Sequence, residues 1–344
     1  MSEQRTEISS LGEFGLIEHL TQNIELQNAS SVLGVGDDAA VIDHFGKQTV
    51  ITTDLLIEGV HFDLAYTPLK HLGYKAVVVN LSDVYAMNAT PTQVIIGLGI
   101  SNRFSLEALD DFYEGVYAAC SAYGVDLVGG DTTSSQKGFI ISVTALGEVS
   151  PDTFVKRSTA RKGDLLCVSG NLGGAYVGLL FLEREKKIFL ESPGVQPDLE
   201  GESYVIGKLL KPEARKDIVE FFAKQQIVPT SMIDISDGLS SEILHLCKES
   251  RLGCVLYEEK IPVAEEMKKA AFKFEIDPTA CALSGGEDYE LLFTIPQTEY
   301  DKLVLNEEIS VVGYMTDAEQ GAHIVTKGGG KHPLTAQGWN HMKQ

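Results

Sequence analysis

The sequence lacks long apolar runs and carries little positive charge. No stretch of about 18 apolar residues occurs in the 344-residue chain, so no transmembrane helix is expected. The first five residues are polar and show no signal-peptide hydrophobic segment, which makes the cytoplasm the expected location. Lysine and arginine number 28 against 49 acidic residues, for a formal charge of −21. Such a surface repels nucleic acid and anionic membranes, so neither is an expected partner.

Cysteine is scarce, and the common nucleotide and hydrolase motifs are missing. The five cysteines are widely spaced and form no Cys-x-x-Cys or Cys/His zinc pattern, so we expect reduced, buried thiols. There is no Gly-x-x-x-x-Gly-Lys-Ser/Thr loop, no Gly-x-Ser-x-Gly elbow, no His-Glu-x-x-His and no protein-kinase motif set. The glycine-rich turn at 170–174 is only a weak phosphate-loop candidate, because a flexible strand-to-helix turn explains it equally well.

Apolar periodicity predicts strands alternating with helices, the pattern of an α/β protein with α+β character and mixed strand pairing. The length and a polar stretch at 150–164 favour two domains, residues 1–150 and 151–344. In the first domain the expected elements are residues 11–28, 48–53, 69–88, 94–100, 105–123, 126–128 and 138–149. Ser105 is the expected N-cap of the helix at 105–123.

Three local features qualify this pattern. The strand beginning at Asp126 is expected to break at Gly129-Gly130-Asp131, and residues 186–203 are expected to form a loop. Asn80 and Asp83 fall on one face of the helix expected at 69–88. Such a pair on an apolar helix is either a satisfied hydrogen-bond pair or a source of metal ligands.

Aspartates recur beside glycine, serine or threonine where apolar runs end. Six of them stand out: Asp38, Asp54, Asp83, Asp131, Asp234 and Asp237. Any one alone is readily explained as a helix or turn cap. Six together favour a metal site, because Mg²⁺ is usually held by one or two carboxylates plus substrate phosphates. If they converge, divalent cations must neutralise them, since the carboxylates would otherwise raise one another's pKa.

Eight short blocks of sequence carry these acids and their neighbours. They are Gly34-Val35-Gly36-Asp37-Asp38, Thr52-Thr53-Asp54, Gly59-Val60-His61-Phe62, Asn80-Leu81-Ser82-Asp83, Gly129-Gly130-Asp131-Thr132, Lys156-Arg157-Ser158, Asp234-Ile235-Ser236-Asp237-Gly238 and Ser284-Gly285-Gly286-Glu287-Asp288. Together the blocks resemble the motifs of the thiamine-monophosphate kinase family. They keep the family's order from about Glu13 to Trp339, and parts are shared with aminoimidazole ribonucleotide synthetase and selenophosphate synthetase.

The resemblance implies ATP-dependent phosphorylation of thiamine monophosphate to thiamine diphosphate, with several Mg²⁺ ions. It also implies a two-domain fold like that of aminoimidazole ribonucleotide synthetase. The N-terminal mixed-sheet domain would bind metal and ATP and pair in a homodimer, and the C-terminal α/β domain would complete the active-site cleft. A phosphomonoester is already ionised near neutral pH, so no general base and no catalytic side chain of that kind are expected.

Site residues follow from the same resemblance, position by position. The matched metal positions are Asp38, Thr52, Thr53, Asp54, Asp83, Asp131, Asp234 and Asp237. The matched ATP positions are Gly130, Asp131, Arg157 and Ser236, and the substrate positions are His61, Glu287 and Trp339. Only the resemblance favours Asp38 over Asp37 as the ligand. Trp339 either stacks on the cationic thiazolium or anchors the C-terminal tail.

Two alternatives remain open. Another ATP-dependent synthetase of the superfamily would share much of this pattern. Selenophosphate synthetase would carry a reactive cysteine in an N-terminal glycine-rich segment, whereas the first cysteine here, Cys120, lies inside an expected helix. Against aminoimidazole ribonucleotide synthetase, the blocks at 129–132 and 284–288 favour the thiamine enzyme. A non-catalytic acidic cation-binding protein would show regular ligand spacing such as an EF-hand loop, whereas these acids are scattered over two hundred residues.

Overall fold

A computed structural model describes residues 16, 19–33 and 41–336 of the chain. These residues form two compact units. One consists of the described residues of Met1–Val84 and Ala89–Asp152, and the other consists of those of Tyr85–Asn88 and Thr153–Gln344. The predicted Asp37, Asp38 and Trp339 lie outside the described residues, as does most of the helix expected at 11–28.

The first unit is built on a four-stranded mixed sheet in the order β3-β6-β4-β5. The strands are β3 (Gln48–Ile57), β4 (Thr90–Ile100), β5 (Asp126–Ser134) and β6 (Ile140–Val149). β6 pairs antiparallel with both β3 and β4, while β4 and β5 run parallel. A separate antiparallel pair joins β1 (Ser31–Leu33) to β2 (Val41–Ile42).

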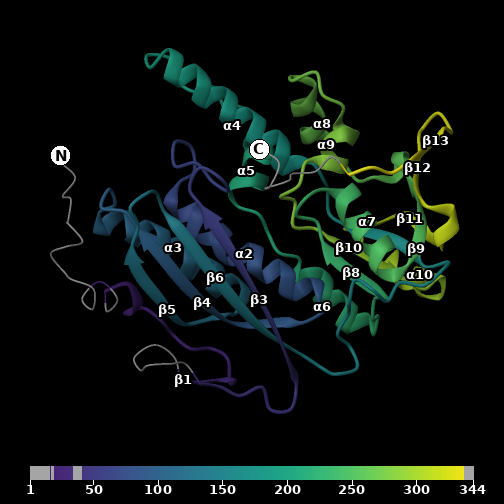
Figure 1. The fold of residues 1–344 in the computed structure, drawn as a ribbon, viewed down its shortest axis with the longest axis horizontal. Helices are drawn as coiled ribbons and strands as arrows, with labels where there is room; N and C mark the ends of the chain where they lie inside the picture. The colour runs from purple at the N-terminus through teal and green to yellow at the C-terminus, as the bar shows by residue number, and fades with distance from the viewer. Residues whose placement is uncertain (1–15, 17–18, 34–40, 337–344) are drawn as a thin grey trace. The chain divides into compact units, whose positions relative to one another are not determined.

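Two helices, α2 (Leu69–Ala86) and α3 (Leu106–Tyr123), accompany this sheet in the first unit (Figure 1). The Ser105 side chain accepts a hydrogen bond from Ala108 N, so the predicted N-cap is confirmed. Gly124 ends α3 in the left-handed conformation. The helices approach closely, because a Cβ added to Gly115 would lie 1.9 Å from the Lys70 carbonyl oxygen.

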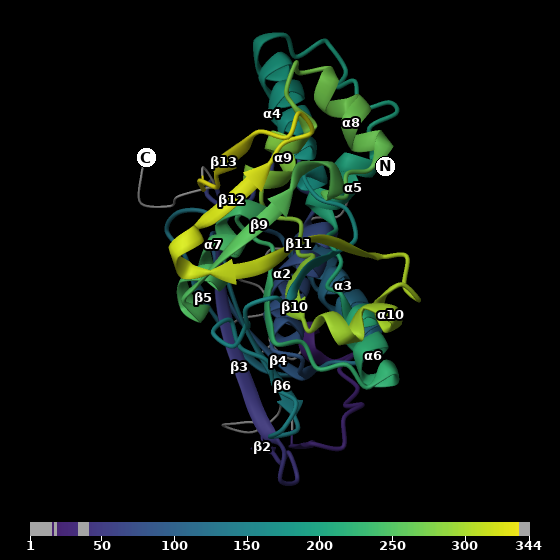
Figure 2. The same cartoon turned by 90° about the vertical axis from the view of Figure 1, so that its right-hand side faces the viewer.

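The second unit is built on a seven-stranded sheet in the order β13-β12-β9-β11-β7-β10-β8 (Figure 2). Its strands are β7 (Leu165–Ser169), β8 (Ser231–Asp234), β9 (Leu252–Tyr257), β10 (Leu291–Ile295), β11 (Ile309–Asp317), β12 (Ala322–Val325) and β13 (Lys331–Pro333). The β9–β12 pair is parallel and the other neighbours are antiparallel.

The second unit contains the helices α4 (Gly174–Glu191), α5 (Ser203–Leu210), α6 (Lys216–Gln225), α7 (Leu239–Ser250), α8 (Glu265–Phe272), α9 (Pro278–Ser284) and α10 (Tyr300–Leu303). Residues of α4, α5, α7, α8 and α9 contribute to two hydrophobic clusters. Short 3-10 turns lie at Glu258–Lys260, Gln297–Glu299 and Ala318–Gln320. Apolar residues of α7 pack with those of the sheet strands in one cluster, and α4, α5, α8 and α9 supply the other.

The fold class is confirmed as mixed α/β with two large sheets, while two local predictions are wrong. β5 continues through Gly129-Gly130-Asp131 to Ser134, because pairing with β4 holds the glycines in the ladder. α4 extends to Glu191, so 186–191 is helical rather than loop. All five cysteines are buried free thiols. Across the ranges the structure describes, no helix is long and apolar enough to cross a membrane.

The α2–α3 contact predicts a sharp difference between two glycine substitutions. Gly115→Ala should lower the free energy of unfolding by about 3 kcal/mol, because the new methyl group overpacks a backbone contact. Gly207→Ala is the control, since that helical glycine has nothing within 4 Å of its added Cβ. It should be neutral or stabilising by up to about 1 kcal/mol. Thermal unfolding monitored by circular dichroism measures both, and equal changes would contradict the packing assigned to α2 and α3.

Candidate functional site

The first group of predicted site residues joins the middle of β3 to α2. The Thr52 hydroxyl donates to Asp83 Oδ2 at 2.6 Å, and Asp54 N donates to Asn80 Oδ1 at 3.0 Å. Asn80 is fully buried, and its amide nitrogen donates to the Ala76 carbonyl oxygen at 3.0 Å. Asn80 is therefore a satisfied hydrogen-bonding residue that fixes β3 against α2. Together these bonds hold Thr52, Asp54 and Asp83 close to one another.

Asp54 and Asp83 form a pair of carboxylates that disfavour each other's charge. Burial, reinforced by the charge of Asp83, raises the pKa of Asp54 to about 6. With this pKa, Asp54 is still mostly a carboxylate at pH 7, but its negative charge is less stable than that of an ordinary aspartate. A cation shared by the two carboxylates would remove that penalty.

Thr53 and Asp131 lie on the opposite face of the sheet from Thr52 and Asp54. The Thr53 hydroxyl donates to the Val143 carbonyl oxygen at 3.0 Å and accepts from Thr144 Oγ1 at 3.0 Å. One row across the sheet consists of Asp54, Val143, Ile96 and Gly130, and the next consists of Leu55, Ser142, Gly97 and Asp131. Adjacent residues of a strand face opposite sides of the sheet, so this register places Asp131 and Asp54 on opposite faces.

Gly130 allows β4 and β5 to approach closely at this row. A Cβ added to Gly130 would lie 2.3 Å from the Ile96 carbonyl oxygen, a distance no side chain tolerates. Gly130 and Asp131 are both exposed, so the backbone of β5 is accessible at this position. That accessibility is what a backbone contact to a phosphate or nucleotide requires.

His61 lies in a tight turn that follows β3. Its backbone N donates to the Ile57 carbonyl oxygen at 2.9 Å, and its Nδ1 accepts from Ile57 N at 3.0 Å. Because Nδ1 is an acceptor, the neutral ring carries its proton on Nε2. A cavity of about 470 Å³ borders the same turn, lined by Glu58, Gly59, Ser101, Asn102, Arg103, Gln136, Lys137 and Gly138.

The second group of predicted residues lies in the other unit, where two loops pair through their backbones. Glu287 N donates to the Ser236 carbonyl oxygen at 2.7 Å, and Tyr289 N donates to that of Ile235 at 2.9 Å. Gly286 adopts φ 73°, and its added Cβ would lie 2.5 Å from the Ser236 carbonyl oxygen. The glycine thus lets residues 286–289 lie directly on residues 235–237, which brings Glu287 beside Ser236 and Asp237.

Glu242, in the first turn of α7, adds a third acid beside Asp234 and Asp237. It is 2% exposed; its Oε1 accepts from Asp237 N at 3.1 Å, and its Oε2 has no hydrogen-bond partner. Burial raises the pKa of Glu242 to about 8; the hydrogen bond from Asp237 N opposes the shift, and the charges of Asp237 and Asp234 add to it. An orphaned carboxylate oxygen in this position is suited to a proton or a cation.

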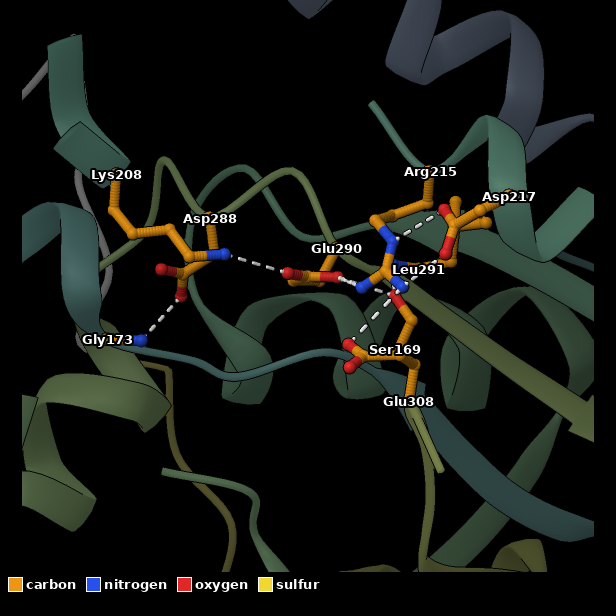
Figure 3. Close-up of polar contacts among 9 residues, drawn as sticks. All are labelled: Ser169, Gly173, Lys208, Arg215, Asp217, Asp288, Glu290, Leu291 and Glu308. Atoms are coloured by element: carbon orange, nitrogen blue, oxygen red, sulfur yellow. Dashed lines mark hydrogen bonds and ion pairs between the residues drawn. The ribbon is translucent and has the colours of Figure 1, made fainter. Parts of the chain in front are cut away.

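Arg157 and the glycine-rich turn complete the predicted set. Arg157 is exposed, and its carbonyl oxygen accepts from Ser250 Oγ at 3.0 Å. At the glycine-rich turn, Gly173 N donates to Asp288 Oδ2 at 2.7 Å (Figure 3). The protein's own carboxylate therefore occupies the anion position at the start of α4, so the turn is a capped helix start rather than an open phosphate loop.

The donor chemistry of both groups fits Mg²⁺, which prefers carboxylate and hydroxyl oxygens. No three His, Cys, Asp or Glu side chains within the described ranges lie close enough to hold an ion by themselves. The acids instead occur in small sets, and in the second set Glu242 keeps an oxygen without a hydrogen-bond partner. Small sets suit Mg²⁺, which keeps several waters and takes its remaining ligands from substrate phosphates.

Sequence patterns did not single out Glu242, although one signal was present. An acid in the first turn of a helix that follows Asp234-Ile235-Ser236-Asp237-Gly238 is placed to accept a hydrogen bond from that loop. Nothing local in the sequence distinguished Glu290, Arg215 or Lys208, whose contacts are long-range.

Glu242 predicts a specific pH dependence of stability. Its pKa is raised in the folded protein, so the folded state binds the proton more tightly and stability falls as pH rises from about 4.5 to about 8. Glu242→Gln should remove a penalty on the order of 3 kcal/mol at pH 8.5 and far less at pH 5.

Urea unfolding in EDTA at the two pH values measures this difference. Glu220→Gln is the matched control, because the side chain of Glu220 is 67% exposed. A gain for Glu242→Gln that is the same at both pH values would show that Glu242 ionises normally.

Comparisons with known proteins agree with these motifs. Residues 36–149 match the family described as AIR synthase related protein, N-terminal domain. A thiamine-monophosphate kinase of Aquifex aeolicus is 36% identical, over 97% of this chain and 99% of the relative. That of Bacillus subtilis is 29% identical over 97% of this chain and 100% of its own length.

Solved structures share the fold along nearly the whole chain. One described as AaThiL complexed with AMPPCP and TMP is 33% identical, with a TM-score of 0.74 and coverage of 99% of this chain and 100% of that one. Hydrogenase maturation protein HypE in complex with ATP has a TM-score of 0.74 at 20% identity, covering 93% and 94% of the two chains, and shows the fold alone. With a 36%-identical relative matched end to end, this chain belongs to the thiamine-monophosphate kinase family.

Proposed function

We propose that this protein transfers the γ-phosphoryl group of ATP to thiamine monophosphate, giving thiamine diphosphate and ADP in a Mg²⁺-dependent reaction. The observation that carries the proposal is the near-complete match to a 33%-identical structure described as complexed with AMPPCP and TMP. The two acid groups described above agree with it, because polyphosphate cannot approach unneutralised carboxylates without a cation.

The reaction needs alignment more than acid–base chemistry. An oxygen of the acceptor phosphate, already ionised, attacks the γ-phosphorus in line, and the bond from that phosphorus to the β,γ-bridging oxygen breaks. Bound Mg²⁺ would neutralise charge on the phosphates. Thr52, Asp54 and Asp83 would hold one set of oxygen ligands, and Asp234 and Asp237 another. We assign Asp38, Thr53 and Asp131 to the same role from the resemblance.

The remaining residues bind the two substrates. Gly130 offers exposed backbone, Arg157 an exposed guanidinium and Ser236 an exposed hydroxyl, all suited to ATP phosphates or ribose. The His61 Nε2 proton makes that ring a neutral donor toward thiamine monophosphate. Glu287, partly exposed, is a carboxylate suited to the cationic acceptor, and Trp339 is assigned by resemblance to stacking on the thiazolium.

Domain roles follow from this assignment. Residues 1–150 would supply metal binding, ATP contacts and dimerisation, and residues 151–344 would supply the remaining ligands. A homodimer is supported by the uncovered face of the four-stranded sheet, on which Ile51 is 64%, Leu55 56%, Ile95 37% and Ile140 36% exposed. Apolar side chains gathered on one sheet face are typical of a protein–protein contact.

The central test is a coupled assay with ATP, Mg²⁺ and thiamine monophosphate, in which the protein should form thiamine diphosphate. Asp54→Asn and Asp131→Asn should each lower kcat/KM by about 100-fold or more, because charge stabilisation of the transferring phosphoryl group is lost. Asp317→Asn is the control, since Asp317 pairs with Lys162 outside both acid groups.

Two results would contradict the proposal. Well-folded protein that forms no thiamine diphosphate would exclude the activity, and ADP release with another acceptor would favour a different synthetase of the superfamily. Unchanged turnover in both aspartate variants would exclude their role as metal ligands, and cation binding without any transfer would indicate a non-catalytic cation-binding protein.

The dimer proposal has its own test. Leu55→Lys should raise the dimer dissociation constant by about 100-fold, because a buried unpaired ammonium costs several kcal/mol. Leu305→Lys is the control, with the replaced side chain 67% exposed near α10. Analytical ultracentrifugation distinguishes the outcomes, and a dimer that survives Leu55→Lys unchanged would exclude this sheet face as the interface.

A further inference from the structure

Residues 285–290, called the strap here, hold an unfavourable backbone. Gly286, Glu287 and Tyr289 have φ angles of 73°, 61° and 52°. Non-glycine residues in this left-handed region cost about 1–3 kcal/mol each and persist only where surrounding structure enforces them. The strap carries Glu287, so whatever enforces its conformation also decides where that carboxylate lies.

One side of the strap is held by backbone hydrogen bonds. Glu287 N and Tyr289 N donate to residues 236 and 235, and Ile235 N donates back to the Glu290 carbonyl oxygen at 2.8 Å. These bonds fix the strap to the loop that carries Ser236 and Asp237. They hold the backbone as far as Glu290, while the Glu290 side chain turns inward and is held by other contacts.

The other side is held by the side chain of Glu290, which is 2% exposed (Figure 3). Its Oε2 accepts from Arg215 Nη1 at 2.5 Å and from Ser169 Oγ at 2.7 Å, and its Oε1 accepts from Lys208 Nζ at 3.1 Å. Ser169 Oγ also accepts from Leu291 N at 2.8 Å. The carboxylate therefore ties the end of the strap to α5, to the start of α6 and to β7.

Arg215 is itself held in place. Its Nε and Nη2 donate to the two carboxylate oxygens of Asp217 at 2.9 and 2.7 Å, while Nη1 remains directed at Glu290. A planar guanidinium with three nitrogens committed has a fixed orientation. Glu290 is thereby fixed in turn, which a mobile lysine alone would not achieve.

We propose that Arg215 and Lys208 are positioning residues for the acceptor substrate, acting through Glu290 to set the conformation of the strap and hence the place of Glu287. The inference rests on the proposed function, since Glu287 is assigned to the substrate there. Neither cation contacts substrate in this role. A buried ion pair is weak evidence for stability. Separating its partners leaves a buried charge without compensation, so Arg215 and Glu290 are held in contact.

The test compares two lysine-to-methionine variants, each of which removes the cation paired with a buried glutamate. Lys208→Met removes a cation from Glu290, and Lys273→Met removes one from Glu202, which is 5% exposed and lies outside the strap. Arg215→Met removes the second cation, and Arg215→Lys keeps the charge without the planar fork. Lys208→Met keeps the test decisive should Arg215→Met fail to fold, because the Lys208 side chain is partly exposed.

Lys208→Met and Arg215→Met should raise the KM for thiamine monophosphate by about tenfold or more, with a smaller change in the KM for ATP. In the free protein, deuterium exchange of peptides covering 285–291 should be about tenfold faster. Lys273→Met should change neither quantity, and Arg215→Lys should restore part of the lost affinity.

Equal losses of melting temperature in all three methionine variants, with unchanged KM and unchanged exchange in 285–291, would overturn the inference and leave the network purely structural. If the wild-type protein makes no thiamine diphosphate, the proposed function fails. The exchange measurement on free protein still decides whether Arg215 and Lys208 hold the strap, so the two failures remain distinguishable.

Discussion

The energetic cost of burying carboxylates near one another is the constraint on which both groups of site residues depend. Asp54 lies beside Asp83, and Glu242 lies beside Asp234 and Asp237. In each set, burial is the largest cause of a raised pKa, and the neighbouring charge adds to it. The surrounding structure offsets this cost only in part, through the hydroxyl that Thr52 donates to Asp83 and the bond from Asp237 N to Glu242. Both sets therefore favour the arrival of positive charge.

The two units position these side chains in different ways. In the first unit, strand alternation and a hydrogen-bonded helix face put Thr52, Asp54 and Asp83 on the same side. In the second unit, two loops pair through backbone atoms, which needs left-handed residues at Gly286 and Glu287. A strand position is fixed by register, whereas a loop position has to be enforced by contacts elsewhere. This difference explains why the strap, and not β3, depends on a buried ion network.

The sequence was sufficient for the fold class, for the four-stranded sheet and the two long helices of the first unit, and for the Ser105 cap, because each follows from local periodicity or local capping. It failed where tertiary pairing overrides a local signal. Gly129 and Gly130 indicated a break, yet pairing with β4 keeps them in β5. The sequence could not indicate the Glu290 network either, since Arg215 and Glu290 are 75 residues apart and only the fold brings them together. Glu242 was detectable in principle, as a first-turn acid after a site motif.

Glu290 differs from Asp54 and Glu242 in how the charge of its carboxylate is balanced. Glu290 has its cations built in, Arg215 and Lys208, so its charge is balanced in the free protein. No lysine or arginine is recorded in an ion pair with Asp54 or Glu242 among the described residues, and Glu242 keeps an oxygen without a partner. A permanent ion pair would block such an oxygen from any ligand. Asp54, which lies in a motif of the thiamine-monophosphate kinase family, and Glu242, which follows another, thus keep a charge that a bound cation can balance.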